Sequence, residues 1–501
     1  MSIRLLLDMS AQAYPDRIAL GAREGGVTFA DLAGVADVGS RVLGRYGART
    51  VAFVGVNSPV VPQLLFASAT AGVPFAPLNY RLSSTVLREL IGRLDRPLVV
   101  ADPEYVDIVR GTADVVLTTG QWAESVTAEA VGNLEIEGNV ERDDDSPAIL
   151  LFTSGTTAAP KCVVLRHRHL LSYVLGTVAF GSAEETACAL LSVPPYHIAG
   201  MGAVLTNTYS ARRVAYLPDF KPTGWLELVR AEQVTHAMVV PTMLARVMEH
   251  LDGTDANCPS LVSMAYGGAR MPLPVLTRAL KAFSTTGFVN AYGLTETSST
   301  ISVLGPDEHR QAVAHGPIGR LASVGRVVPG MEAQVRSEDG DVLPAEATGE
   351  LWVRGAQVSG EYAGIGSVLD PDGWFPTRDR ARFDEDGYLY LDGRSDDTII
   401  RGGENISPAE VEDVLLDHPA VREVAVVGVP DSDWGERLSA VVVLHDSVTV
   451  TAEELRSHVR SQLRGSRTPD DVEFRTELPY TPTGKLLRRT LVAQLVAAAA
   501  S

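Results

Sequence analysis

Residues 151–161 read Leu151-Phe-Thr-Ser-Gly-Thr-Thr-Ala-Ala-Pro-Lys161, a stretch in which an apolar segment runs directly into a polar loop. The apolar run Ala148–Phe152 predicts the buried strand. The loop that follows offers four hydroxyl side chains, one glycine and a lysine. Donors that converge in this way suit an anion such as a polyphosphate. The G-x-x-x-x-G-K-[ST] pattern is absent, so this is not a Walker A loop. The alternative is a Ser/Thr-rich surface turn.

Strands and helices alternate around this loop through roughly the first 300 residues. The expected strands include Val51–Gly55, Leu98–Ala101 and Ala237–Val240, and the expected helices include Val60–Ala71 and Trp225–Ala231. Such βα alternation predicts an α/β fold of mostly parallel sheets with helices on their faces.

The pattern changes from about residue 315 to 392, where Gly and Pro turns separate short strands such as Gly349–Val353. This predicts a small, β-barrel-like antiparallel region. Beyond it we expect a helix at Pro408–Leu416 with Ser407 as its N-cap. Further elements make a small α+β unit: strands Val424–Val427 and Ser439–Leu444, and a helix at Ala452–Leu463. We therefore expect a large N-terminal domain, 1–394, and a small mobile C-terminal domain, 395–501.

The composition is that of a globular protein, and its charge excludes two kinds of partner. The 501 residues are 45% hydrophobic and 21% charged, with a formal net charge of -19. This balance excludes the basic footprint of a nucleic-acid binder and argues against adhesion to an anionic membrane. No apolar run approaches a membrane span, and Asp8 interrupts the N-terminal leucines, so we expect a cytoplasmic protein. Cys162, Cys188 and Cys258 form no C-x-x-C pair and are expected to be small buried residues.

Lysine is scarce: Lys161, Lys221, Lys281 and Lys485 are four of the 43 basic residues, and the rest are arginine. Codon bias is sufficient to explain this. A retained lysine nevertheless marks a position where a compact ammonium on a flexible stem is useful, since a planar guanidinium does not replace it.

A second stretch suited to a nucleotide is Val289-Asn-Ala-Tyr-Gly-Leu-Thr-Glu296. Gly293 lets a backbone approach a ligand closely. Tyr292 can stack on a base, and Glu296 can hold Mg²⁺ through a carboxylate oxygen. The alternative is an ordinary strand end followed by a turn.

Two further stretches carry charged residues. Asp379 and Arg394 can both bond ribose hydroxyls, although a surface ion pair is the commoner meaning of such residues. The stretch Leu478-Pro-Tyr-Thr-Pro-Thr-Gly-Lys485 presents a lysine on a Pro/Gly turn, from which it can reach a neighbouring cleft. A solvated lysine is the alternative.

Taken together, these four stretches resemble the adenylate-forming superfamily of acyl- and aryl-CoA synthetases, peptide-synthetase adenylation domains and luciferases. The resemblance covers essentially the whole chain in the family's order. Further matching segments are Pro195–Gly200, Tyr266–Ala269, Gly349–Gly355, Gly393–Asn405 and Gly428–Asp431.

The resemblance implies an acid–thiol ligase that uses ATP, Mg²⁺ and CoA. A small carboxylic acid attacks the α-phosphate, pyrophosphate leaves, and a thiol then displaces AMP from the acyl-AMP. Positioning and electrostatic stabilisation supply most of such catalysis. The resemblance also implies that the C-terminal domain swings about Asp396 between the two half-reactions.

The resemblance assigns roles to individual residues. The catalytic residues are expected to be Lys485, His197, Thr156 and Glu296, with Glu296 and Thr156 as metal ligands. The nucleotide and CoA are expected to contact Thr153, Ser154, Gly155, Thr156, Thr157, Lys161, Gly267, Gly268, Ala269, Asn290, Ala291, Tyr292, Gly293, Thr295, Asp379, Arg394, Gly402, Gly403 and Lys485. The expected walls of the acid pocket are Tyr173, Gly176, Tyr196, His197, Val239, Tyr266 and Gly293.

Four positions depart from the family's pattern. Ala158 and Cys162 stand where glycine is common, Arg378 stands where glycine usually precedes the ribose aspartate, and Arg270 stands where proline is common. An alanine at position 158 is strained if that position needs a positive φ. The departures remove no catalytic group and are typical of a specialised relative.

Three hypotheses remain open at this point. The first is an acyl- or aryl-CoA synthetase, in which a homodimer is one assembly to expect. The second keeps adenylation but passes the acyl group to a separate carrier protein or another nucleophile, since the chain has no G-x-D-S-L carrier motif of its own. The third is a non-catalytic binding relative, against which the presence of Glu296, Asp379, Arg394 and Lys485 argues.

Overall fold

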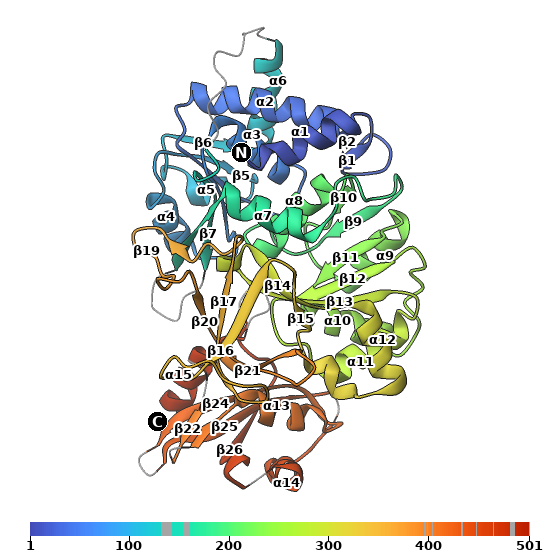
Figure 1. Ribbon diagram of the computed structural model, residues 1–501, viewed down its shortest axis with the longest axis vertical. Helices are drawn as coiled ribbons and strands as arrows, with labels where there is room; N and C mark the ends of the chain where they lie inside the picture. Colours follow the sequence, from blue (N-terminus) through green and yellow to red (C-terminus); the bar gives the residue numbers. More distant parts are fainter. Residues whose placement is uncertain are drawn as a thin grey trace.

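The computed structural model describes residues 1–131, 143–153, 160–394, 397, 399–402, 404–431, 434–446, 448–463, 465–480 and 486–499. The strands of this described part form four sheets. Two are large and mostly parallel, and two are small and mostly antiparallel. Figure 1 shows the C-terminal sheet at one end of the long axis, beneath the small antiparallel sheet.

The first large sheet contains the two strands that flank residues 154–160. Its order is β19 (Gly366–Ser367), β18 (Glu361–Tyr362), β8 (Lys161–Arg166), β7 (Pro147–Thr153), β4 (Phe75–Leu78), β3 (Thr50–Val54), β5 (Pro97–Ala101) and β6 (Val115–Thr118). Strands β7, β4, β3, β5 and β6 are parallel neighbours. By contrast, β7 and β8 are antiparallel, so the loop 154–160 connects the two strands of a hairpin.

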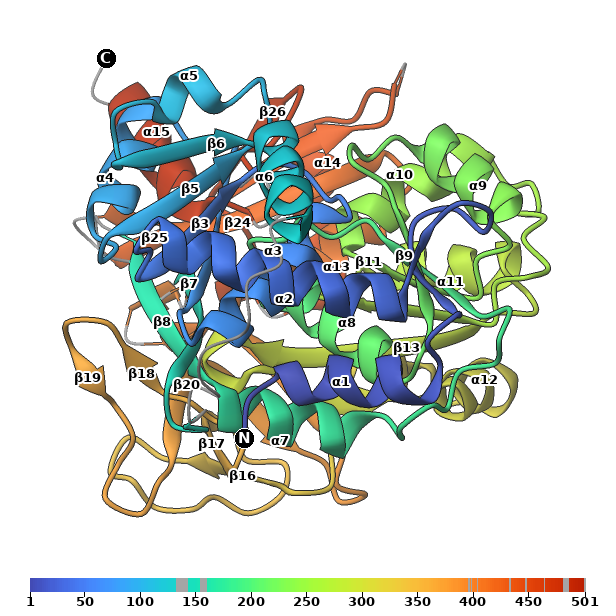
Figure 2. The same ribbon diagram turned by 90° about the horizontal axis from the view of Figure 1, so that it is seen from above.

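Helices follow four strands of this sheet as the βα pattern predicts. They are α3 (Val60–Ala71) after β3, α4 (Ser84–Gly92) after β4, α5 (Val106–Val109) after β5 and α6 (Thr119–Val131) after β6, whereas α2 (Phe29–Arg45) precedes β3. Helix α3 is apolar almost all round, because it is buried between the sheet and α2. Seen from above in Figure 2, α2 and α1 (Arg4–Ala13) run side by side across this part of the molecule.

The second large sheet carries most of the candidate site. Its order is β15 (Arg326–Val327), β14 (Ser299–Leu304), β13 (Gly287–Leu294), β12 (Ser263–Gly267), β11 (His236–Val239), β9 (Cys188–Leu191), β10 (Arg213–Tyr216), β1 (Ile18–Leu20) and β2 (Val27–Thr28). Strands β13, β12, β11, β9 and β10 are parallel neighbours, and the antiparallel β14 closes the site end of β13.

Two helix layers cover this sheet. One face packs against α9 (Pro222–Ala231), α10 (Pro241–Leu251), α11 (Leu273–Ala282) and α12 (Pro306–His315), which line one side of the molecule in both views (Figures 1 and 2). Side chains of the other face join a second core cluster with α1, α7 (His167–Thr177) and α8 (Ile198–Tyr209). The face on which a strand residue lies therefore decides which of these cores it enters.

The antiparallel region consists of β16 (Met331–Arg336), β17 (Gly349–Gly355), β20 (Phe375–Phe383) and β21 (Leu389–Arg394). Its apolar side packs on Tyr292, Leu294 and Ile301 from the second large sheet. This contact brings β20 and β21 against the end of β13.

The fourth sheet lies beyond residue 394. It contains β23 (Glu404–Ile406), β22 (Ile399–Arg401), β25 (Gly435–Leu444), β24 (Val421–Asp431) and β26 (Asp471–Arg475), with helices α13 (Pro408–Leu416), α14 (Ala452–Gln462) and α15 (Arg488–Ala499). Its two apolar faces form cores of their own, one under α13 and α14 and the other under α15.

One detail of α13 differs from the prediction. Ser407 occupies the N-cap position, but its side chain makes no capping bond. Its hydroxyl instead donates to the Asp392 carbonyl oxygen at 2.8 Å. The serine therefore ties α13 to β21, because a hydrogen bond across the junction replaces the local one.

The junction between β21 and α13 is polar. Arg270, on the loop after β12, forms an ion pair with Asp413 of α13. Beside the pair lies a cavity of about 460 Å³. Its lining is mainly charged or hydroxyl-bearing: Arg270, Thr348, Arg380, Asp392, Ser407, Ala409, Glu410 and Asp413.

Two predictions from composition can be compared with the fold. Cys162, Cys188 and Cys258 are all free and buried, which confirms their expected role. Among the helices of the described residues, none combines the length and the apolarity that crossing a membrane requires.

Candidate active site

The first cluster of the site joins Tyr292, Asp379 and Arg394. The Tyr292 hydroxyl donates to Asp379 Oδ2 at 2.5 Å, and Arg394 Nη1 lies 3.5 Å from Asp379 Oδ1. Asp379 and Arg394 face each other as register partners on β20 and β21, whereas Tyr292 comes from β13. Burial, and then the Asp379 charge, raise the pKa of Tyr292 well above its usual 10, so the phenol remains a neutral donor.

The second cluster joins Glu296, Tyr362 and Lys161. Glu296 lies in a short 3-10 turn, Thr295–Thr297, directly after β13. The Tyr362 hydroxyl donates to Glu296 Oε1 at 2.7 Å. Lys161 Nζ lies 5.2 Å from the centre of the Tyr362 ring, which is cation–π distance. Tyr362 is not among the predicted site residues, because nothing in the two-residue strand β18 marks it.

Glu296 suits the metal that the resemblance implies. Among the described residues, no group of three or more His, Cys, Asp or Glu side chains is placed to hold a metal ion. Mg²⁺ needs no such cage, since it keeps several waters and is bound through one or two carboxylates together with substrate phosphates. A single carboxylate with one oxygen bonded to Tyr362 therefore fits Mg²⁺ that arrives with a nucleotide.

The glycines of β12 and β13 are required by neighbouring backbone. A Cβ on Gly293 would lie 1.8 Å from the Ser299 carbonyl oxygen, and one on Gly267 would lie 2.2 Å from the Ala291 carbonyl oxygen. The close approach that we expected of Gly293 is thus to β14. Gly268 is exposed, has φ +81, and begins the loop that carries Ala269 and Arg270.

Three other predicted nucleotide contacts lie around the same strand end. The Asn290 amide donates to the Ser323 carbonyl oxygen at 3.1 Å and so ties β13 to the following segment. Ala291 pairs with Gly267 across the parallel strands. Thr295 opens the turn that holds Glu296.

The described ends of the phosphate loop meet at the last pair of the β7–β8 hairpin. Thr153 pairs with Lys161, and the Thr153 hydroxyl donates to the Lys161 carbonyl oxygen at 3.4 Å. Arg93 was not anticipated: Nη1 donates to the Pro160 carbonyl oxygen at 2.7 Å, and the guanidinium lies over Phe152 at 5.2 Å. Ser154, Gly155, Thr156, Thr157 and Ala158 lie outside the described residues, as do Asp396, Gly403 and Lys485.

The residues predicted to line the acid pocket lie on several elements. His197 is the N-cap residue of α8, and its buried Nε2 has no hydrogen-bond partner within the described part of the chain. Burial lowers the pKa of His197 to about 4, so the imidazole is neutral. The neighbouring Tyr196 packs edge-on against Tyr80. On α7, Tyr173 packs beside Gly202 of α8.

Four of the predicted pocket walls lie elsewhere: three enter apolar cores and one is exposed. Val239 and Tyr266 are register partners on β11 and β12, and both enter the core beneath α9 to α12. The Tyr266 hydroxyl is bonded to His309 Nε2 at 2.8 Å. Tyr173 enters the core on the other face. Gly176 lies on the exposed last turn of α7, with nothing within 4 Å of the place of a Cβ.

Strand alternation accounts for the positions of Val239 and Tyr266, because successive side chains point to opposite faces. Met238 and Ala265, which precede Val239 and Tyr266, lie on the opposite face and are partly exposed.

Gly402, predicted at the CoA entrance, is exposed with φ +58, and its N–H donates to the Trp434 carbonyl oxygen at 2.8 Å.

The departures from the family's pattern have different outcomes. Arg378 has φ +65, a conformation that costs an L residue roughly 1–2 kcal/mol and that glycine adopts freely. Cys162 lies buried within β8 opposite Phe152, where no special backbone conformation is needed. Arg270 makes the ion pair to Asp413 that crosses the junction.

Comparison with known proteins agrees with this geometry. Residues 7–363 match the AMP-binding enzyme family, and residues 410–485 match the AMP-binding enzyme C-terminal domain. The chain is 34% identical to a feruloyl-CoA synthase of Amycolatopsis sp over 90% of this chain and 89% of that protein. It is 31% identical to a fatty acid–[acyl-carrier-protein] ligase of Streptomyces coeruleorubidus over 88% and 86%.

A solved structure gives the same result. The chain superposes on the o-succinylbenzoate CoA synthetase of Bacillus subtilis in complex with its acyl-adenylate intermediate, with a TM-score of 0.83, 29% identity and 97% of each chain covered. The chain belongs to the adenylate-forming family of AMP-binding enzymes. It is an AMP-forming acid–CoA ligase, which activates a carboxylic acid with ATP to an acyl-AMP, releases pyrophosphate and transfers the acyl group to CoA.

Proposed function

We propose that the two clusters at the end of β13 divide the nucleotide between them. Tyr292, Asp379 and Arg394 take the adenosine, with Asp379 and Arg394 on the ribose hydroxyls. Lys161 and Glu296 take the phosphates and the Mg²⁺ ion. The observation that carries this proposal is the position of Tyr292 and Glu296, because one strand end presents both, each bonded to a residue brought in from another sheet.

The charges of the second cluster suit the first half-reaction. Two anions must meet when a carboxylate attacks an α-phosphate, and negative charge then moves toward the leaving pyrophosphate. An ammonium at the end of the phosphate loop and a metal on Glu296 would neutralise that charge without rearrangement. Bound Mg²⁺ supplies Lewis acidity toward the phosphate oxygens.

We also propose that Lys485 bridges the substrate carboxylate and the α-phosphate, and that the chain divides at residue 394 with Asp396 as hinge. The change of sheet between β21 and β22 supports the division. We expect Lys485→Ala to abolish pyrophosphate release while sparing thioester formation from supplied acyl-AMP. Lys485→Arg keeps the charge and should still lose most adenylation, because a planar fork does not replace a point charge. Equal loss of both half-reactions in Lys485→Ala would contradict this role.

The identity of the acid substrate is the main property to determine. Purified protein with Mg²⁺-ATP should release pyrophosphate with its own acid and not with others, so a panel of aromatic and medium-chain acids identifies the substrate class. Failure with every acid of a broad panel would contradict the assignment. The homodimer remains a prediction that light scattering of the purified protein checks.

A carrier-protein thiol is the second candidate acceptor. The similarity to a fatty acid–[acyl-carrier-protein] ligase supports it, since that relative covers most of this chain. AMP release measured with CoA and with candidate carrier proteins, using the acid that gives pyrophosphate release, separates the two acceptors.

A further inference from the structure

Tyr362 lies between the two charged groups of the second cluster. Its hydroxyl donates to Glu296 Oε1 at 2.7 Å, and its ring faces Lys161 Nζ at 5.2 Å. Within the described part of the chain, neither Lys161 nor Glu296 forms an ion pair. An ammonium and a carboxylate attract each other, and a direct pair between Lys161 and Glu296 would occupy both groups. Each of them instead contacts the Tyr362 side chain.

We propose that Tyr362 is a positioning residue for the metal-binding carboxylate Glu296, and that the ion pair between Arg166 and Glu361 holds the strand that carries it. The inference rests on the proposed role of Glu296. One carboxylate oxygen is fixed by the phenol, which leaves the other oxygen aimed and available for a cation. The ring also leaves Lys161 available for phosphate.

The backbone around Tyr362 is fastened to both partners. Tyr362 is the register partner of Val163 on β8, and the Ala363 N–H donates to the Cys162 carbonyl oxygen at 2.8 Å. On the other side, the Ser359 N–H donates to the Glu296 carbonyl oxygen at 2.8 Å. The segment 359–363 therefore bridges the strand that begins at Lys161 and the turn that holds Glu296.

The side-chain anchor of this bridge is a two-pronged ion pair. Arg166 Nε lies 2.8 Å from Glu361 Oε2, and Nη2 lies 2.7 Å from Oε1. Both side chains are largely shielded, with 22% and 23% of their surfaces exposed, so solvent screens the pair only partly. The hydrogen bonds to Glu361 raise the pKa of Arg166, and the guanidinium remains charged.

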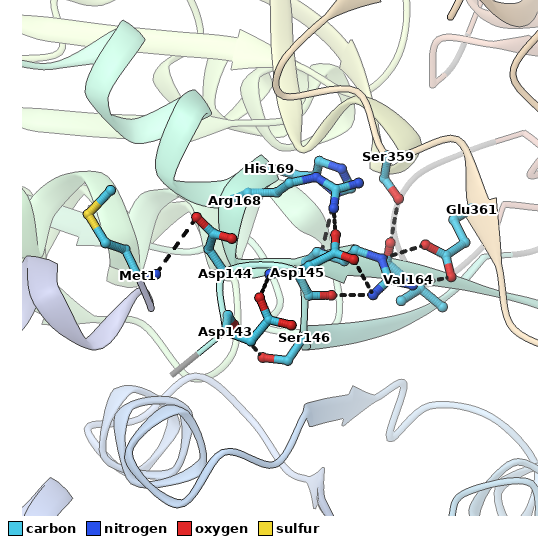
Figure 3. Close-up of polar contacts among 11 residues, drawn as sticks. Met1, Asp143, Asp144, Asp145, Ser146, Val164, Arg168, His169, Ser359 and Glu361 are labelled. Atoms are coloured by element: carbon cyan, nitrogen blue, oxygen red, sulfur yellow. Dashed lines mark hydrogen bonds and ion pairs between the residues drawn. The ribbon is translucent and has the colours of Figure 1, made fainter. Parts of the chain in front are cut away.

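Figure 3 shows that the anchor extends further on both sides. The Ser359 hydroxyl bonds the Val164 carbonyl oxygen, so β18 is pinned to β8 on either side of Tyr362. Arg166 also bonds the Asp145 carbonyl oxygen, and its backbone N–H donates to His169 Nδ1 at 3.4 Å. Burial lowers the pKa of His169 to about 4, which keeps that nitrogen an acceptor. The phenol is thus placed by a rigid network and not by its own strand alone.

The test uses Mn²⁺ as the metal probe and a non-hydrolysable ATP analogue, so that no turnover is needed. In Tyr362→Phe, we expect the Kd of Mn²⁺ in the presence of the analogue to rise roughly tenfold, as loss of a hydrogen bond to a charged acceptor implies. The Mg²⁺ concentration for half-maximal pyrophosphate release should rise by a similar factor, with Tm unchanged. Tyr390→Phe is the matched control. Tyr390 lies on β21, and its hydroxyl also donates to a carboxylate, Asp384 Oδ2, at 3.3 Å.

Glu361→Gln tests the anchor. We expect it to weaken Mn²⁺ binding roughly threefold in the wild-type background and to add nothing in the Tyr362→Phe background, because Glu361 acts through Tyr362. Unchanged Mn²⁺ affinity in Tyr362→Phe, an equal loss in Tyr390→Phe, or additive losses in the double variant would each overturn the inference. Absence of Mn²⁺ binding in the wild type would instead count against the role of Glu296 itself.

Discussion

Replacing Gly293 by alanine should disrupt both the stability of the site and its chemistry. The added Cβ would lie 1.8 Å from the Ser299 carbonyl oxygen, 2.5 Å from its carbon and 2.9 Å from the Thr300 Cα, all of them backbone atoms that cannot rotate away. Ordinary contact needs about 3.4 Å, so β14 must retreat by roughly 1.5 Å. Gln357 opposes this movement, because its amide donates to the carbonyl oxygens of Thr297 and Thr300, both at 2.9 Å.

The expected magnitude follows from these contacts. Overpacking costs about 1–3 kcal/mol, and each lost Gln357 hydrogen bond costs about 1 kcal/mol more, so we expect a total of roughly 3–5 kcal/mol. The same movement shifts Glu296, which lies three residues after Gly293 in the turn that follows β13. A displacement of about 1 Å in a catalytic constellation can cost about 100-fold in rate. Tm from thermal unfolding and the rate of pyrophosphate release measure the two effects.

Gly34→Ala is the matched control. Gly34 lies exposed within α2 with nothing within 4 Å of a Cβ, so the same substitution should stabilise the helix by up to about 1 kcal/mol. A wild-type Tm and rate in Gly293→Ala, or a response like that of Gly34→Ala, would contradict the expected clash with β14.

Three further predictions concern the first cluster, the strained arginine and the buried histidine. Tyr292→Phe keeps the ring but removes the donor to Asp379, so the KM for ATP in the pyrophosphate assay should rise about tenfold or more, and an unchanged KM would contradict the role of this bond. Arg378→Gly should raise Tm by relieving about 1 kcal/mol of strain at φ +65, with Arg380→Gly as the control that loses an arginine side chain without relieving such strain. The pKa of His197 is about 4 in the folded state against the usual 6.5, so the unfolded state takes up the proton first as pH falls. The free energy of unfolding therefore decreases between pH 6.5 and pH 4, by about 2 kcal/mol at pH 5. Between pH 7 and pH 5, the Tm of His197→Asn should fall less than that of the wild type.

Much of the fold follows from local pattern. Helices α3 and α13 begin and end at the predicted residues, Val60–Ala71 and Pro408–Leu416, and each has a clear signal at one end. Helix α3 ends at Gly72 with φ +72, and α13 begins with proline at its first position. The change of texture near residue 315 and the change of sheet after residue 394 were likewise visible as changes in spacing and turn residues.

The site was predictable where one strand carries it and not where distant segments meet. Tyr292 and Glu296 share a single motif, so their proximity is local. The partners Tyr362 and Glu361 are separated from Lys161 and Arg166 by about two hundred residues of chain, and no sequence spacing reports such a contact. The core positions of Val239 and Tyr266 were not predictable for another reason, since the face of a strand changes with every residue and a shift of one position moves a side chain to the opposite core.

The polar junction between β21 and α13 has a mechanical consequence. Separating two apolar surfaces costs about 25 cal/mol for each Å² exposed to water. Here the parts meet through the Arg270–Asp413 pair, the Ser407 hydroxyl and a polar cavity of about 460 Å³, which is large enough to hold many waters. If the C-terminal part turns about residue 396 as proposed, the movement exposes little apolar surface to water. Its free-energy cost is then mainly that of replacing ion pairs by hydration. Added salt should lower this cost, because salt screens ion pairs.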